Sequence, residues 1–210
     1  MTLVKREKRF LKTDIYPVIT PEFCKERSPI RILESCLKGG AKIVLLRDKK
    51  DPEKYAADFR KITNRYNALL IINDSLEIAL KHNADGIHLG INDLPINEAR
   101  RLAPELLIGA SIHNLQEALS AQDNGASYIN IGPIFLTKTK PGVKRFLGVE
   151  AIREISPHIK IPFTVMGGIN KENILQVLDI GARHIAMVTA ITEAEDVEKT
   201  AQEFIRLCSP

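Results

Sequence analysis

The sequence predicts an α/β fold, a single-domain (β/α)8 TIM barrel, and three observations support this prediction. First, apolar runs of strand length alternate with amphipathic segments of helix length along all 210 residues, a pattern typical of parallel strands joined by helical crossovers. Second, a weak internal repeat places a helix-ending turn and a small residue before every second strand. Third, the length is at the low end of the range for eight such units.

Each predicted strand is a short apolar run. The eight runs are Ile15–Ile19, Lys42–Leu46, Leu69–Ile72, Gly86–Leu89, Leu107–Ala110, Tyr128–Ile131, Phe163–Met166 and His184–Val188. The repeat consists of Gly40-Ala41, Asn83-Ala84, Gly125-Ala126 and Gly181-Ala182, before the second, fourth, sixth and eighth runs. The alternative is an open doubly wound sheet, but no GxGxxG motif follows the first strand.

Capping residues between these runs predict where helices begin. Ser28-Pro29 is typical of an N-cap followed by proline at the first helical position, and Asp51-Pro52 repeats this pattern. Asn114, with Glu117 three residues later, resembles a capping box, and Asn170 is a further candidate cap. These signals predict the helices that alternate with the strands.

The composition indicates a globular chain with a substantial core and excludes a membrane-spanning protein. Hydrophobic residues make up 44% of the chain, yet no stretch approaches the roughly 18 uncharged apolar residues of a spanning helix. Cys24, Cys36 and Cys208 form no CxxC pair, so neither a zinc site nor a disulfide framework is indicated. Because reduced thiols are typical of the cytoplasm, we expect a cytoplasmic protein without a membrane partner.

The excess positive charge lies at the N-terminus. The formal net charge is +4, and the basic residues of segment 1–13, less its one glutamate, account for all of it. A nucleic-acid binder would usually carry its excess charge across a folded face, so we expect no nucleic-acid partner. Residues 1–13 are predicted to be a basic N-terminal arm or capping segment, and residues 14–210 the catalytic barrel. A targeting peptide is the alternative, although the segment lacks an apolar core.

In a barrel of this kind, the active site lies just past the carboxyl ends of the strands. These positions are polar in this chain. After the second to sixth strands they are Arg47, Asp48, Lys49, Asn73, Asp74, Asn92, Asp93, Ser111, His113, Thr137, Thr139 and Lys140. The last two strands end in Gly167-Gly168-Ile169 and Val188-Thr189-Ala190.

Asp74 and Asp93 predict a divalent metal site at this face. We expect these two acids to converge with Arg47, Lys49 and Lys140 from neighbouring strand ends. Two carboxylates beside several cations suggest a hard cation bound partly by protein and partly by phosphate oxygens, as Mg²⁺ usually is. The alternative is that each aspartate caps the helix that follows it.

A second anion site is predicted on the later strand ends. The segment GPIFLTKTK, Gly132–Lys140, offers hydroxyl donors from Thr137 and Thr139 together with two lysines. Gly167-Gly168 and the turn after Val188 stand where barrels often bind phosphate through backbone amides and a helix N-terminus. The alternatives are a solvated basic loop and a purely structural glycine turn. Two anion sites favour two phosphorylated substrates, or one that is bis-phosphorylated.

Covalent catalysis is not predicted, because no serine–histidine–acid or cysteine–histidine pattern stands out. His88 lies within the fourth strand, where core packing is a better interpretation than catalysis. His113 is interpreted as a ligand-positioning residue rather than a proton carrier. The pattern favours a reaction that needs positioning and charge stabilisation.

Several specific motifs follow one another between residues 15 and 191. They are LLRDK at Leu45–Lys49, IIND at Ile71–Asp74, ADGIHLGINDLP at Ala84–Pro95, GASIHN at Gly109–Asn114, GPIFLTKTK, VMGGI at Val165–Ile169 and MVTAI at Met187–Ile191. In this order they resemble the thiamin phosphate synthase family. The resemblance implies a (β/α)8 barrel, with Mg²⁺ as cofactor and a possible homodimer. It also implies that a hydroxymethylpyrimidine diphosphate is joined to a thiazole phosphate, giving thiamin phosphate and pyrophosphate.

The resemblance also implies roles for individual residues. The expected Mg²⁺ ligands are Asp74 and Asp93. The expected diphosphate contacts are Arg47, Lys49, Asn73, Ser111 and Lys140, and the expected thiazole phosphate contacts are Thr137, Thr139, Gly168, Val188 and Thr189. Catalysis is expected from Arg47, Lys49 and Lys140, because cations stabilise the charge that develops on departing pyrophosphate.

Three positions depart from the usual family pattern. Leu45 and Ile91 stand where glutamine is common, and Thr189 replaces a frequent serine while keeping the hydroxyl. Loss of glutamine at position 45 removes a possible hydrogen bond to the pyrimidine.

Two alternatives remain open. One is the sister branch of thiazole tautomerases, which tends to have histidine in place of Pro133 and to lose the aspartate pair. The other is a non-catalytic paralogue that binds thiamin intermediates, for which Leu45 is the best support. Residues Lys140–Leu147 are predicted to form a lid over bound diphosphate.

Overall fold

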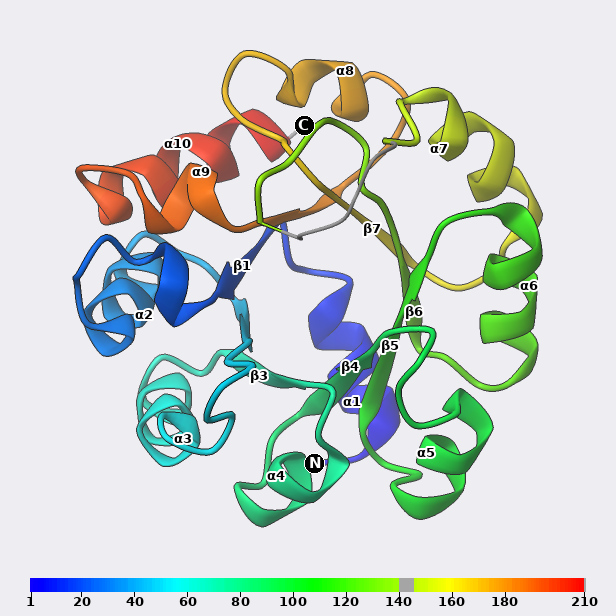
Figure 1. Cartoon of the computed structure of the whole chain (residues 1–210), viewed down its shortest axis with the longest axis horizontal. Helices are drawn as coiled ribbons and strands as arrows, with labels where there is room; N and C mark the ends of the chain where they lie inside the picture. Colours follow the sequence, from blue (N-terminus) through cyan, green and yellow to red (C-terminus); the bar gives the residue numbers. More distant parts are fainter. Residues whose placement is uncertain (140–145, 210) are drawn as a thin grey trace.

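Eight parallel strands close into a barrel in which each strand pairs with the next along the chain and β8 pairs with β1. The structure is a computed structural model and describes residues 1–139 and 146–209. Figure 1 shows the strands as a ring with helices around its outside. This arrangement confirms the predicted (β/α)8 barrel.

The strands lie close to their predicted positions. They are β1 (Ile15–Ile19), β2 (Ile43–Leu46), β3 (Leu69–Asn73), β4 (Gly86–Leu89), β5 (Leu107–Ile112), β6 (Tyr128–Ile131), β7 (Phe163–Met166) and β8 (His184–Met187). β5 extends further than predicted because its pairing with β6 continues to Ile112. β3 also extends one residue further than predicted, to Asn73, so Asn73 and Ser111 are both strand residues. β8 ends at Met187, so Val188 lies in the turn after it.

The helices follow the strands in the predicted order. They are α1 (Leu3–Phe10), α2 (Pro29–Lys38), α3 (Ala56–Arg65), α4 (Leu76–Lys81), α5 (Ile96–Leu102), α6 (Leu115–Asp123), α7 (Glu150–Ile155), α8 (Ile174–Leu178), α9 (Thr189–Thr192) and α10 (Val197–Cys208), with short 3-10 turns η1 (Pro21–Phe23) and η2 (Ser156–His158). None of the helices in the described residues combines the length and apolarity that crossing a membrane requires.

Two of the predicted helix caps are confirmed. The Ser28 hydroxyl accepts a hydrogen bond from the Ile30 N–H at the start of α2. The Asn114 side chain accepts from the Glu117 N–H over 2.9 Å, and the Glu117 carboxylate accepts from the Asn114 side-chain amide over 2.8 Å. A capping box would place the Glu117 carboxylate on the backbone N–H of Asn114, so these bonds confirm Asn114 as a side-chain cap of α6 without the full capping box.

The prediction that Asp51-Pro52 begins a helix is wrong. The Asp48 carboxylate accepts hydrogen bonds from the N–H groups of Lys50 and Asp51, over 2.9 and 3.2 Å, and so folds the chain into a compact loop. A turn follows this loop, and α3 begins only at Ala56. The predicted cap at Asn170 is confirmed only in part. Its side chain accepts a hydrogen bond from the Glu172 N–H over 2.9 Å, but α8 begins later, at Ile174.

The short repeat has a clear conformational basis. Gly40, Asn83, Gly125 and Gly181 all have positive φ angles, of 103°, 50°, 90° and 94°. Glycine and asparagine adopt this left-handed conformation most readily, so each can end a helix and turn the chain into the next strand. Asn67, before β3, does the same with a φ of 51°. The repeat is therefore not restricted to alternate strands and does not define a two-strand unit.

The interior of the barrel is filled by side chains from alternate strand positions and by α1. Phe10 of α1 is buried and stacks on Tyr128 with ring centroids 4.5 Å apart. Arg6 pairs with Asp85 at 3.6 Å and donates to the Glu105 carbonyl. Because Asp85 and Glu105 precede β4 and β5, α1 covers the amino-terminal end of the barrel, opposite the expected active site. In Figure 1, α1 (blue) lies across the centre of the ring.

Candidate active site

A pocket opens at the carboxyl ends of the strands and brings most of the predicted site residues together. The lining includes Arg47, Lys49, Asn73, Asp74, Asp93, Ser111, Thr137, Thr139 and Val188. Gly168 and Thr189 do not line it, although their neighbours Gly167 and Val188 do. Lys140 and residues 140–145 of the predicted lid lie outside the described residues.

Asp74 and Asp93 line the pocket and do not cap helices, so the capping alternative is wrong. The cap of α4 is Ser75, whose hydroxyl accepts from the Ile78 N–H over 3.3 Å. The Asp93 carboxylate instead accepts from the Gly90 N–H over 2.6 Å. Asp74 has a φ of 62°, an uncommon conformation in which a polar residue at a site is often held for function.

The Asp93 carboxylate disfavours the charge of the neighbouring Asp74 carboxylate. Burial, together with the neighbouring Asp93 carboxylate, raises the pKa of Asp74 to about 6, while the nearby cations Lys49 and Arg47 act in the opposite direction. A divalent cation between two such carboxylates would relieve the repulsion, so the donor set fits Mg²⁺. The described residues contain no group of three or more acidic, histidine or cysteine side chains able to hold a metal. Further ligands would therefore come from phosphate oxygens and water.

We expect Asp74→Asn to stabilise the metal-free protein above pH 6. Because the folded-state pKa of Asp74 lies above the ordinary value of 3.8, the folded state holds this proton more tightly, and stability is lost as the pH rises from about 4 to about 6. With allowance for partial exposure, the variant should gain about 1 kcal/mol, or about 2–4 °C in Tm. The measurement is thermal unfolding in EDTA at pH 4 and pH 8.

Exposed Asp123, at the end of α6, provides the matched control. Asp123→Asn should leave Tm nearly unchanged at both pH values. An Asp74→Asn gain of equal size at pH 4 and pH 8 would contradict the pairing of the two carboxylates.

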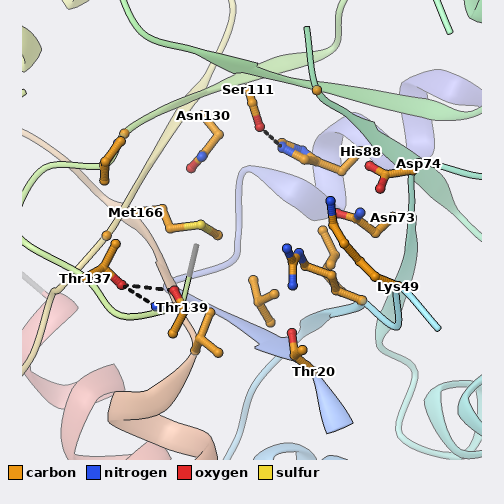
Figure 2. A pocket seen from close by; sticks show the side chains of 18 of the residues that line it. Thr20, Lys49, Asn73, Asp74, His88, Ser111, Asn130, Thr137, Thr139 and Met166 are labelled. Carbon is orange, nitrogen blue, oxygen red and sulfur yellow. Dashed lines mark hydrogen bonds between the residues drawn. The ribbon is translucent and has the colours of Figure 1, made fainter. Parts of the chain in front are cut away.

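The opposite side of the pocket offers uncharged donors. Figure 2 shows Thr137 and Thr139 across the pocket from Lys49, Asn73 and Asp74. The two threonine hydroxyls lie 2.9 Å apart, and the Thr139 N–H donates to the Thr137 hydroxyl over 3.3 Å. A phosphate at this side would meet hydroxyl and backbone donors, whereas the Asp74 side offers carboxylates and cations.

The glycines beside this end have left-handed backbones. Gly167 and Gly168 have φ angles of 108° and 62°. A Cβ atom on Gly168 would lie 2.3 Å from the Leu136 carbonyl oxygen. Glycine therefore permits both the turn and the close packing of Phe135 and Leu136 against it.

Polar residues inside the strands also line the pocket, and the sequence reasoning undervalued them. His88 on β4 and Asn130 on β6 are both buried and face the barrel interior, while Ile87 and Ile129 beside them face the helices. Burial lowers the pKa of His88 to about 4, with Asp93 acting weakly in the opposite direction, so the ring is neutral at pH 7. Because successive side chains of a strand point to opposite faces, the apolar neighbours that face the helices indicate that His88 and Asn130 face inward.

Thr20 is a further residue that the sequence reasoning missed. It follows β1 and lines the pocket together with Val18 and Leu45. Its buried hydroxyl oxygen has no hydrogen-bond partner within the described part of the chain. In Figure 2 this hydroxyl points toward the pocket.

The chain is similar to one group of proteins along nearly all of its length. The family model described as thiamine monophosphate synthase matches residues 15–191. The thiamine-phosphate synthase of Pyrococcus horikoshii is 43% identical over 85% of this chain and 87% of that protein. The corresponding protein of Halalkalibacterium halodurans is 40% identical over 90% of this chain and 92% of that protein. The solved structure of thiamine phosphate pyrophosphorylase from Pyrococcus furiosus superposes with a TM-score of 0.84 and 34% identity, over 98% of this chain and all of that one.

Proposed function

Because the chain belongs to the thiamine monophosphate synthase family, we propose that it joins 4-amino-2-methyl-5-hydroxymethylpyrimidine diphosphate to 4-methyl-5-(2-hydroxyethyl)thiazole phosphate. The products are thiamin phosphate and pyrophosphate. The chain is a transferase, as its named relatives are. The observation that carries the proposal is the polarity of the pocket, which has a carboxylate-and-cation end and an uncharged donor end.

The diphosphate is proposed to bind at the carboxylate-and-cation end. Arg47, Lys49 and Asn73 line this end and would bond its oxygens, with Ser111 on the neighbouring wall. Asp74 and Asp93 would hold Mg²⁺, which when bound neutralises charge on the diphosphate oxygens as a Lewis acid. Lys140 would add a further cation.

The thiazole phosphate is proposed to bind at the uncharged end. The hydroxyls of Thr137 and Thr139 and the backbone near Gly168 and Val188–Thr189 would donate to its oxygens. Among the described residues that line the pocket, this end has no carboxylate pair like that of Asp74 and Asp93. The difference between the ends gives each substrate one orientation in the pocket.

The proposed reaction is a dissociative substitution. The bond between the pyrimidine methylene carbon and the diphosphate oxygen breaks, and the electron pair leaves with pyrophosphate. The pyrimidine amino group supports the resulting cation, and the thiazole nitrogen donates its lone pair to form the new C–N bond. No protein nucleophile and no proton abstraction are needed, so the side chains act by positioning the substrates and stabilising charge.

The apolar wall between the two ends is proposed to contact the rings. Val18, Leu45 and Met166 line this part of the pocket, and the Thr20 hydroxyl lies beside them. Leu45 would offer the pyrimidine apolar contact in place of a glutamine hydrogen bond. The Thr20 hydroxyl, which has no partner among the described residues, would be a nearby alternative for a ring substituent. The proposal therefore accommodates the departure at position 45.

Incubation of the purified protein with both substrates tests this proposal. We expect equal amounts of thiamin phosphate and pyrophosphate to form with Mg²⁺ and neither to form in EDTA. Isomerised thiazole phosphate without pyrophosphate would instead identify a tautomerase, although Pro133, Asp74 and Asp93 all follow the synthase pattern. Binding of either substrate without turnover would identify a non-catalytic binding protein.

A further inference from the structure

A chain of hydrogen bonds crosses the barrel interior and ends at the pocket. The hydroxyls of Tyr16 and Tyr128 lie 2.9 Å apart, and the Tyr128 hydroxyl lies 3.2 Å from Nδ1 of His88. Nε2 of His88 lies 2.9 Å from the Ser111 hydroxyl, as the dashed line in Figure 2 marks. Tyr16, Tyr128 and His88 are buried, whereas Ser111 lines the pocket.

The register of the strands and the packing around Tyr128 hold the residues of this hydrogen-bond chain in place. His88, Gly109 and Tyr128 are register partners on β4, β5 and β6, so the histidine and tyrosine side chains meet above the glycine. A Cβ atom on Gly109 would lie 2.4 Å from the Tyr128 hydroxyl and 2.5 Å from Nδ1 of His88. Phe10 of α1 stacks on the other side of Tyr128. Packing thus fixes the tyrosine ring from two sides.

The direction in which the groups of this hydrogen-bond chain donate follows from counting donors and acceptors. Within residues 1–139 and 146–209, the His88 ring nitrogens contact two hydroxyls and no carboxylate, so the buried ring is neutral and has one donor and one acceptor. If Nδ1 carried the proton, Tyr128 would have to donate to Tyr16. The Tyr16 hydroxyl proton would then have no acceptor among the described residues. A buried donor without an acceptor is unfavourable.

The opposite direction satisfies every donor. Tyr16 donates to Tyr128, Tyr128 donates to Nδ1 of His88, and Nε2–H of His88 donates to the Ser111 oxygen. The Ser111 proton then has no acceptor among the described residues and points into the pocket. We infer that Tyr128 and His88 are positioning residues that turn the Ser111 hydroxyl into a fixed donor for a phosphate oxygen bound in the pocket. The choice of diphosphate as that ligand rests on the proposed function.

Nitrogen-15 NMR of histidine-labelled protein tests the direction without substrate. His88→Gln identifies the His88 signals by their loss. We expect the wild-type ring to be protonated at Nε2 only, with Nδ1 accepting a hydrogen bond, and Tyr128→Phe to move the Nδ1 signal toward that of an imine nitrogen without a hydrogen bond. Tyr16→Phe is the matched control, because Tyr128 can still donate to His88 and the Nε2–H form should persist. A protonated Nδ1 in the wild-type protein would overturn the inference.

A double-mutant cycle tests the effect on the pocket, with inorganic pyrophosphate and Mg²⁺ as the probe. Tyr128→Phe should weaken pyrophosphate binding about three- to tenfold in the wild-type background, the worth of one hydrogen bond. In the Ser111→Ala background the same change should have no further effect. Equal effects in both backgrounds would show a merely structural role and overturn the inference.

The two tests also separate this inference from the proposed function. If the wild-type protein makes no thiamin phosphate but the NMR and pyrophosphate results are as expected, the proposed function fails and the role of Tyr128 stands. If thiamin phosphate forms but the cycle is additive, the reverse holds. Should Tyr128→Phe fail to fold, His88→Gln replaces it in the cycle, since it removes the bond between Tyr128 and the ring.

Discussion

Asp93→Asn should reduce the rate of thiamin phosphate formation by about 10²–10³-fold, the loss typical of removing one charge-stabilising group. The asparagine oxygen can still accept the hydrogen bond from the Gly90 N–H, which spans 2.6 Å in the structure. The loop should therefore keep its conformation while the metal site loses half of its charge. Steady-state turnover, measured over a Mg²⁺ titration, checks this expectation.

Asp48→Asn is the matched control for this change. The Asp48 carboxylate also accepts backbone N–H bonds in a loop after a strand, but it does not line the pocket. We expect Asp48→Asn to stay within about threefold of wild-type turnover, as surface changes of this kind usually have small effects. If Asp93→Asn kept a large part of the wild-type rate at low Mg²⁺ concentration, the two aspartates would not be the metal site.

Gly168→Ala should lower kcat/KM for thiazole phosphate by about 10²-fold, the loss expected when a binding group moves by about 1 Å. The residue has a φ of 62°, and a Cβ atom would lie 2.3 Å from the Leu136 carbonyl oxygen and 2.9 Å from Cβ of Phe135. The added methyl group must push these segments apart, next to the hydroxyls of Thr137 and Thr139. Initial rates at varied thiazole phosphate concentration measure the effect.

Gly181→Ala separates backbone strain from damage to the site. Gly181 also has a positive φ, of 94°, but an added Cβ would meet no described atom within 4 Å. Both alanine variants should lower Tm, because alanine is strained at positive φ. Only Gly168→Ala should lose activity. Equal losses of kcat/KM in the two variants would exclude a phosphate-binding role for the Gly168 turn.

The barrel was predictable because its signals are local and repeated. Eight apolar runs, each following a helix, leave few arrangements other than a closed parallel sheet. The helix caps and left-handed turns depend on neighbouring residues alone. The helix start at Asp51-Pro52 was predicted incorrectly because this local pattern does not include the effect of Asp48, three residues earlier. The pattern fits a cap, but the Asp48 carboxylate occupies the nearby N–H groups and delays the helix to Ala56.

The site was predictable where a residue lies at the carboxyl end of a strand or just past it. Asp74, Asp93 and Lys49 stand at such positions, and they line the pocket. His88 and Asn130 lie within strands, where burial in a core and burial in a pocket look alike in the sequence. The hydrogen-bond chain was beyond sequence reasoning, because it depends on Gly109 leaving space for a tyrosine from the next strand.

We propose that one pocket holds a metal-assisted diphosphate at one end and an uncharged phosphate cradle at the other. A crystal structure with thiamin phosphate, pyrophosphate and Mg²⁺ would locate both ends at once. We expect pyrophosphate beside Arg47 and Lys49, with the metal on Asp74 and Asp93, and the thiamin phosphate group on the hydroxyl of Thr137 or Thr139. Pyrophosphate at the threonine end, or a metal bound away from both aspartates, would show that the two ends of the pocket do not bind these groups as proposed.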